Sequence, residues 1–97
     1  MSERYILRGK IPVIEPDTLK WERWCEAKDR HVALDKPSAD VTVSTVFLGL
    51  DYQFGDGPPL LFESMIFGGA HDQELARCST WDEAEAQHIR MVTEARK

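Results

Sequence analysis

Residues 51–59, DYQFGDGPP, hold the densest group of side chains suited to binding a ligand. Two aromatic, two acidic, two glycine and two proline residues occur within nine positions. Aromatic rings stack on bases or fill a partner's pocket, and successive backbone amides in a glycine-rich turn can cradle an anion. The spacing matches neither a Walker nor a dinucleotide-binding motif. The stretch therefore predicts either a turn with special dihedral angles or a binding loop with the candidate residues Asp51, Tyr52, Phe54 and Asp56.

Glu63 is a second candidate, because it lies between Leu61 and Met65 in an apolar stretch. Burying an unpaired carboxylate is costly. We therefore expect Glu63 to be exposed, to be paired with a cation such as Arg4 or Arg8, or to act as a polar anchor in a pocket. The same two arginines are possible contacts for an anionic ligand.

Two tryptophans, Trp21 and Trp24, are three residues apart and so lie on one face of a helix. Packing in the core accounts for such a pair without any function. A tryptophan at the surface would instead be a contact residue for a partner. Trp21 and Trp24 are therefore both candidate binding residues.

The histidines and cysteines do not predict a catalytic or metal site. His31, His71 and His88 show no i, i+4 or HxH spacing, and Cys25 and Cys78 form no CxxC motif. Nothing in the sequence brings a cysteine next to a histidine. His88 falls on an apolar helical stripe and is expected to be a hydrogen-bonded core residue. We expect no catalysis, no metal and no cofactor.

The charge distribution limits the kinds of partner that the chain can bind. The chain has 97 residues and a net charge of −5, and residues 51–97 carry nine acidic and four basic side chains. From Pro37 to Ala76 there is no lysine or arginine. Duplex nucleic acid is therefore an improbable partner, whereas a basic protein surface or a small ligand remains open. The longest apolar runs are about five residues, too short for a signal peptide or a membrane span, so we expect a cytoplasmic protein.

The elements predicted from hydrophobic patterning form an α+β domain over residues 1–97. A short strand before Pro12 is followed by a helix over 15–34, a loop over 35–40, strands over 41–50 and 60–67, a short third strand near 74–79 and a helix from Trp81. Thr80 and Glu83 form a capping box for this last helix. The prediction is a small antiparallel sheet of three to four strands packed by two helices, in the order β-α-β-β-β-α.

The strands over 41–50 and 60–67 are apolar on both faces. In the first of them one face carries Val41, Val43 and Phe47, and the other carries Val46, Leu48 and Leu50. Because two helices do not cover both faces of such a sheet, the remaining apolar surface predicts a homo-oligomer, and specifically a dimer.

The block VSTVFLGLDYQFGDGPPLLFESMIFGG, followed by STWDEAEAQH, resembles a family of small, functionally uncharacterised proteins encoded by tailed phages and bacterial prophages. The resemblance extends from Leu19 to Val92. The sequence departs from the family pattern at Cys78, where an aromatic residue is expected. The resemblance implies a phage accessory protein and carries over no activity.

Three functions fit these observations. A counter-defence protein would occupy the basic, nucleic-acid-binding surface of a host protein, and the acidic second half of the chain favours this. A sequestering protein would bind a small signalling nucleotide through aromatic stacking and backbone amides. The third function is that of a virion or morphogenesis component. We expect the protein to act in the cytoplasm of an infected or lysogenic bacterium. The loop distinguishes the first two functions, since it should line a cavity with basic groups for a nucleotide and project from the surface for a protein.

Overall fold

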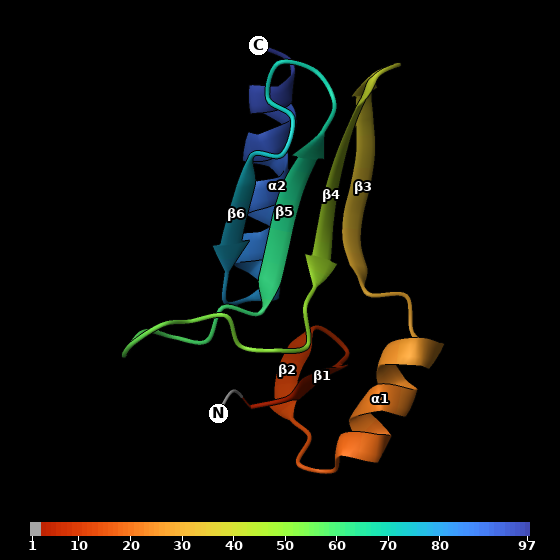
Figure 1. Ribbon diagram of the computed structural model, residues 1–97, viewed down its shortest axis with the longest axis vertical. Coiled ribbons are helices and arrows are strands. Elements are labelled where there is room, and N and C mark those ends of the chain that lie inside the picture. Colours follow the sequence, from red (N-terminus) through yellow and green to blue (C-terminus); the bar gives the residue numbers. More distant parts are fainter. Residues whose placement is uncertain (1–2) are drawn as a thin grey trace.

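The computed structural model describes residues 3–97 and contains two antiparallel sheets and two helices (Figure 1). The main sheet has the strand order β3-β4-β5-β6, and its strands are β3 (His31–Ser38), β4 (Val41–Phe47), β5 (Phe62–Phe67) and β6 (Leu75–Cys78). A hairpin of β1 (Tyr5–Arg8) and β2 (Ile11–Ile14) and the helix α1 (Thr18–Ala27) lie at one end of this sheet, and α2 (Trp81–Ala95) packs on it. The first two residues of the predicted domain lie outside the described residues.

The predicted α+β class is confirmed, with an antiparallel sheet of four strands and two helices. The observed order is β-β-α-β-β-β-β-α, so two strands are additional to those predicted. One is β2, in which Pro12 pairs with Leu7 in an isolated two-stranded ribbon. A proline is tolerated there because each strand of such a ribbon has an unpaired edge.

The other additional strand is β3, where the sequence predicts the end of a helix and a loop. Asp17 caps α1 as expected for the start of a helix, since its Oδ1 accepts the amides of Leu19 and Lys20. The helix ends at Ala27, and the carboxylate of Asp29 accepts the amide of His31 at 3.0 Å in a turn that leads into β3. The predicted helix is therefore too long, because pairing with β4 outweighs the weak helical periodicity after Ala27.

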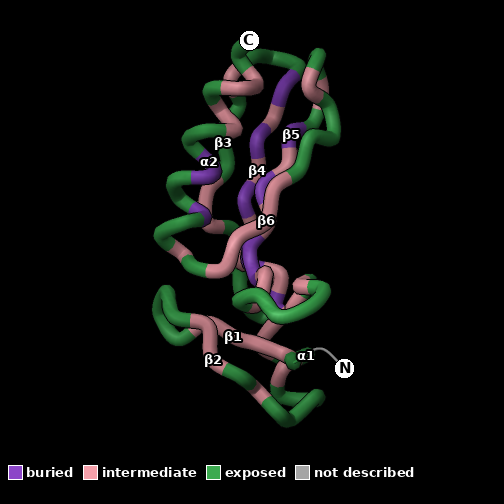
Figure 2. The backbone as a smooth tube through the Cα atoms, turned by 90° about the vertical axis from the view of Figure 1, so that its left-hand side faces the viewer, coloured by how far each residue is buried: buried purple, intermediate pink, exposed green. Residues whose placement is uncertain are grey.

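The core lies between α2 and the face of the main sheet on which Val41, Val43, Thr45 and Phe47 are buried (Figure 2). Four aromatic rings continue this core from α1 through the sheet to α2. Their centroids are 5.7 Å apart from Trp24 to Phe47, 5.3 Å from Phe47 to Phe62 and 6.2 Å from Phe62 to Trp81. The capping box at the start of α2 is present, with the Thr80 hydroxyl accepting the Glu83 amide at 3.1 Å.

Buried polar side chains also join α2 to the sheet. Thr45 Oγ1 lies 2.6 Å from Ser64 Oγ and 2.7 Å from His88 Nδ1, and His88 Nε2 lies 2.7 Å from Asp35 Oδ2. Gln87 donates from Nε2 to Ser64 Oγ at 2.9 Å. The prediction that His88 is a hydrogen-bonded core histidine is confirmed.

The opposite face of the main sheet is covered by neither helix, because α2 packs on the other face and α1 packs on β1. Two rows of paired residues cross this open face. The first row is apolar apart from Ser44 and consists of Leu34, Ser44, Met65 and Leu75; the second consists of His31, Val46, Glu63 and Arg77. Leu34 and Leu75 are exposed. The open face thus offers an apolar strip flanked by a charged one.

We predict that the open face pairs with the same face of a second copy. An apolar row across a sheet is self-complementary about a twofold axis, and pairing removes Leu34 and Leu75 from water. Light scattering at micromolar concentration should give twice the 11.1 kDa mass of one chain, and Leu75→Lys should lower it to the monomer value. A mass of one chain for the unmodified protein would contradict the prediction.

Candidate functional site

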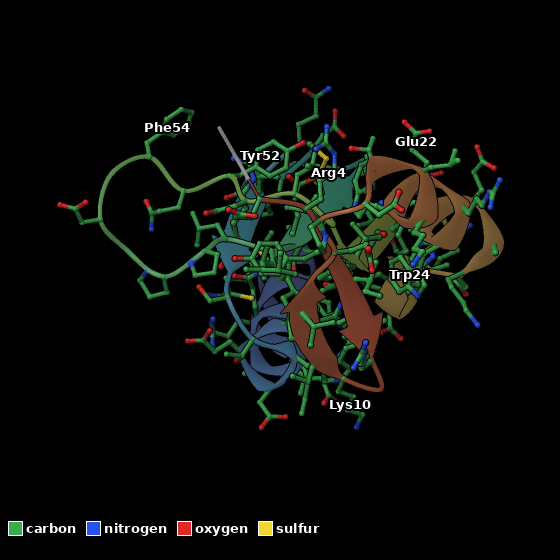
Figure 3. The ribbon with its side chains drawn as sticks, turned by 90° about the horizontal axis from the view of Figure 1, so that it is seen from below. Arg4, Lys10, Glu22, Trp24, Tyr52 and Phe54 are labelled. Carbon is green, nitrogen blue, oxygen red and sulfur yellow. The ribbon has the colours of Figure 1, made fainter. Side chains whose placement is uncertain are left out.

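The connection over residues 48–61 between β4 and β5 projects from the molecule on the side away from α1 (Figures 1 and 3). Its base is closed by Asp51, whose Oδ1 accepts the backbone amides of Gln53 at 2.7 Å and Leu60 at 2.9 Å. The backbone amide of Tyr52 donates to Leu60 O at 3.1 Å. Gln53 Nε2 donates to Pro58 O at 3.1 Å. The loop is therefore held by its own hydrogen bonds, and the carboxylate of Asp51 serves to close it.

One of the two glycines of the loop is required by its shape. Gly55 has a φ of +96°, a conformation that other residues rarely adopt. A Cβ at Gly57 would meet only the side chain of Gln53, which is flexible and can move away. Pro58 and Pro59 restrict the chain that returns to β5. The φ of Gly55 confirms a special dihedral angle in DYQFGDGPP, and it leaves the two aromatic residues unexplained.

The aromatic side chain of Phe54 is at the outer edge of the loop and is 93% exposed (Figure 3). Asp56, two residues after Phe54, is also exposed. Tyr52 lies nearer the body of the protein and is 39% exposed. Folding gains nothing from the side chain of Phe54, since it stays in water. An exposed aromatic residue on an ordered loop is typical of a contact with a partner.

Arg77 connects Tyr52 to the open face of the sheet. Its guanidinium carbon lies 4.6 Å from the centroid of the Tyr52 ring, and its Nε donates to Glu63 Oε2 at 3.0 Å. The expectation that Glu63 is salt-bridged is confirmed, whereas Arg4 or Arg8 as its partner is wrong. Arg77 faces Glu63 across β5 and β6, and this register cannot be read from the sequence.

The remaining candidate residues lie beside the loop or away from it. The backbones of Arg4 and Leu50 pair in an isolated β-bridge. The guanidinium carbon of Arg4 is 5.5 Å from the Trp21 ring centroid. The indole N–H of Trp21 lies within 3.1 Å of Tyr5 O and 3.2 Å of Gly49 O, so it ties α1 to the start of the loop. Arg8 is exposed at the opposite end of β1 from Arg4. Packing explains Trp21 and, as one of the four core aromatics, Trp24.

Residues 51–59 do not line the cavities at the junction of α1 and β3, and of the whole connection only Leu48 lines one of them. One, of about 310 Å³, is lined by Cys25, Lys28, Asp29, Arg30, His31, Val46, Phe47 and Leu48. A neighbouring one of about 260 Å³ shares three of these residues and adds Leu7, Gly9, Trp24 and Trp81. The basic groups of the first cavity are Lys28, Arg30 and His31, which lie between the end of α1 and the start of β3. The sequence did not indicate a site there.

Within residues 3–97, neither the group of Asp35, His88 and Thr45 nor the two cysteines is arranged for nucleophilic attack. The Asp35, His88 and Thr45 chain has the residue types of a catalytic triad, but Thr45 is fully buried. Burial, and secondarily the Glu83 carboxylate, raise the pKa of the Cys78 thiol to about 11. Burial likewise raises the pKa of Cys25. Both thiols are therefore poor nucleophiles near neutral pH.

Comparison with protein-family models, curated proteins and solved structures finds no match. Neither helix in the described part of the chain is long and apolar enough to cross a membrane. The resemblance to phage proteins therefore stays a hypothesis.

The raised pKa of Cys78 gives a testable pH profile. In a Cys25→Ser variant, the rate of alkylation of Cys78 by iodoacetamide should keep increasing above pH 9 and reach half its maximum near the pKa of about 11. The same chain in urea should show the ordinary thiol midpoint. A midpoint near that ordinary value in the folded protein would show that Cys78 is not desolvated.

Proposed function

We propose that the protein is a non-enzymatic phage accessory protein that binds and occupies a host protein in the bacterial cytoplasm. Its role there would be counter-defence. The observation that carries this proposal is the 93% exposure of Phe54 at the edge of a loop held by its own hydrogen bonds. The sequence resemblance supplies the phage setting. The projection of the loop supports a protein partner over a small molecule at this position.

The order of the loop supports the proposal energetically. Immobilising a flexible loop on binding costs entropy, and a loop that is already closed by Asp51 avoids part of that cost. A projecting aromatic ring can enter a pocket on the partner, where such anchors contribute much of the binding energy. Tyr52, stacked on Arg77, would form the half-buried edge of the contact.

The charge near the loop indicates the chemistry of the partner. No lysine or arginine occurs between Pro37 and Ala76, while Asp56 is exposed in the loop. A basic surface would be attracted to this segment, and the basic surfaces of host proteins are commonly those that bind nucleic acid. Such a complex would form faster at low salt than at high salt.

A second candidate function is sequestration of a small signalling nucleotide at the 310 Å³ cavity. Lys28, Arg30 and His31 line it, and its one acidic group, Asp29, is 2.9 Å from His31 Nδ1. Trp24 and Trp81 line the neighbouring cavity and offer stacking surfaces. Mass spectrometry of small molecules released by denaturing the purified protein tests this candidate. A nucleotide recovered in stoichiometric amount would favour it over the host-protein proposal.

We predict that the double variant Tyr52→Ala, Phe54→Ala keeps its fold and loses its partner. Phe54 makes no buried contact and Tyr52 is partly exposed, so at most a few kcal/mol of stability should be lost. Two hot-spot side chains should account for at least about 30-fold in affinity, which corresponds to about 2 kcal/mol. The partner is first captured from infected-host lysate with the unmodified chain, and its affinity for each variant is then measured by titration calorimetry.

The matched control is Ile89→Ala, which truncates a 67% exposed apolar side chain on α2. It should bind as the unmodified protein does. Urea unfolding establishes that all variants are folded. Undiminished affinity in a folded double variant would show that the loop has no role in binding, and loss of the fold would show that its aromatics are structural.

A further inference from the structure

The turn between β5 and β6 brings His71 and Glu74 next to Glu94 in the last part of α2. His71 Nδ1 contacts the carboxylate of Glu74 and lies 3.7 Å from Glu94 Oε1. One donor atom from each of the three residues lies within 4.8 Å of the other two. Donors bound at about 2.0–2.2 Å to one ion are separated by about 3–4 Å, so small rotations of these side chains suffice to surround a metal ion.

The backbone conformation of the β5–β6 turn positions two of the three donor residues, His71 and Glu74. Gly68 and Gly69 have φ values of +90° and +74°, and the amide of Gly68 donates to Asp72 Oδ1 at 2.6 Å. The amide of Glu74 donates to His71 O at 3.1 Å, which places the two side chains three residues apart on one side of a turn. Glu94 comes from a separate element, the helix α2. The spacing in the sequence accounts for the approach of His71 and Glu74, and the packing of α2 brings Glu94 to them.

The charges at this position favour a bound cation. Two carboxylates face one imidazole, and like charges this close repel each other. Among the described residues, Lys97 is the one lysine or arginine paired with either carboxylate, and its Nζ lies 3.4 Å from Glu94 Oε2. Oε1 of Glu94 is the atom near His71. A divalent ion between the three donors would offset the repulsion and leave the pair with Lys97 intact.

We propose that His71, Glu74 and Glu94 bind a divalent transition-metal ion of the Zn²⁺ type. Imidazole together with carboxylate oxygens is a common donor set for Zn²⁺, whereas Mg²⁺ and Ca²⁺ prefer oxygen donors alone. Three protein donors leave at least one coordination position for water. The ion would join the β5–β6 turn to the end of α2, and this role is independent of the proposed function. It departs from the expectation of no metal, which rested on the spacing of the histidines and cysteines in the sequence.

The test is titration calorimetry of Zn²⁺ into the full 97-residue chain after removal of metal with a chelator. One ion per chain should bind with micromolar or tighter affinity, and Mg²⁺ should bind at least about 100-fold more weakly, as the donor set requires. Glu94→Gln and His71→Gln should each weaken Zn²⁺ binding at least about tenfold, within the range seen when a supporting or direct ligand is lost.

The matched control is His31→Gln, because His31 also lies beside a carboxylate, 2.9 Å from Asp29, but the described part of the chain pairs it with no second one. Its affinity for Zn²⁺ should equal that of the unmodified chain. The absorption spectrum with Co²⁺ should lack a thiolate charge-transfer band, which excludes binding by Cys25 or Cys78. In the unmodified chain, the imidazole NMR signals of His71 should shift on addition of Zn²⁺, and this readout does not depend on whether a variant folds. Unshifted His71 signals, or unchanged affinity in folded Glu94→Gln, would overturn the proposal.

Discussion

The position of α2 on the sheet is set by a chain of hydrogen bonds that is buried from Gln87 through Ser64 and Thr45 to His88 and ends at the exposed Asp35. If His88 carries its proton on Nε2 and donates to Asp35, its Nδ1 accepts the Thr45 hydroxyl, Thr45 accepts from Ser64, and Ser64 accepts from Gln87. Every member then has a partner. A shift of the helix by one turn would leave buried polar groups unpaired at about 1–3 kcal/mol each, so this chain of bonds selects one register.

The remaining architecture follows from that register. Since α2 covers one face of the sheet, the other face stays open and carries the apolar row and the Glu63–Arg77 pair. Because β4 pairs with β5, residues 48–61 must leave and return at the same end of the sheet, and Asp51 closes them into the projecting loop. The cluster of His71, Glu74 and Glu94 lies at the opposite end, where β5 turns into β6 (Figure 1).

Local signals in the sequence predicted local features of the fold. The capping box at Thr80, the apolar strand from Val41 and the glycine-dependent loop each depend on residues that are neighbours in the chain. The sequence misplaced β3, because the pairing that makes it a strand lies in β4. It also missed Arg77 as the partner of Glu63 and the approach of Glu94 to His71, since both depend on strand register and helix packing.

The central claim is that the loop over residues 51–60 is already ordered in the free protein and holds Phe54 ready for a partner. Amide hydrogen exchange followed by NMR tests this order at Gln53 and Leu60, whose amides donate to Asp51. We expect both amides to exchange at least about tenfold more slowly than in an unfolded peptide, and Asp51→Ala to remove this protection while β4 stays protected. Exchange of both amides at the unfolded-peptide rate in the unmodified protein would contradict the account.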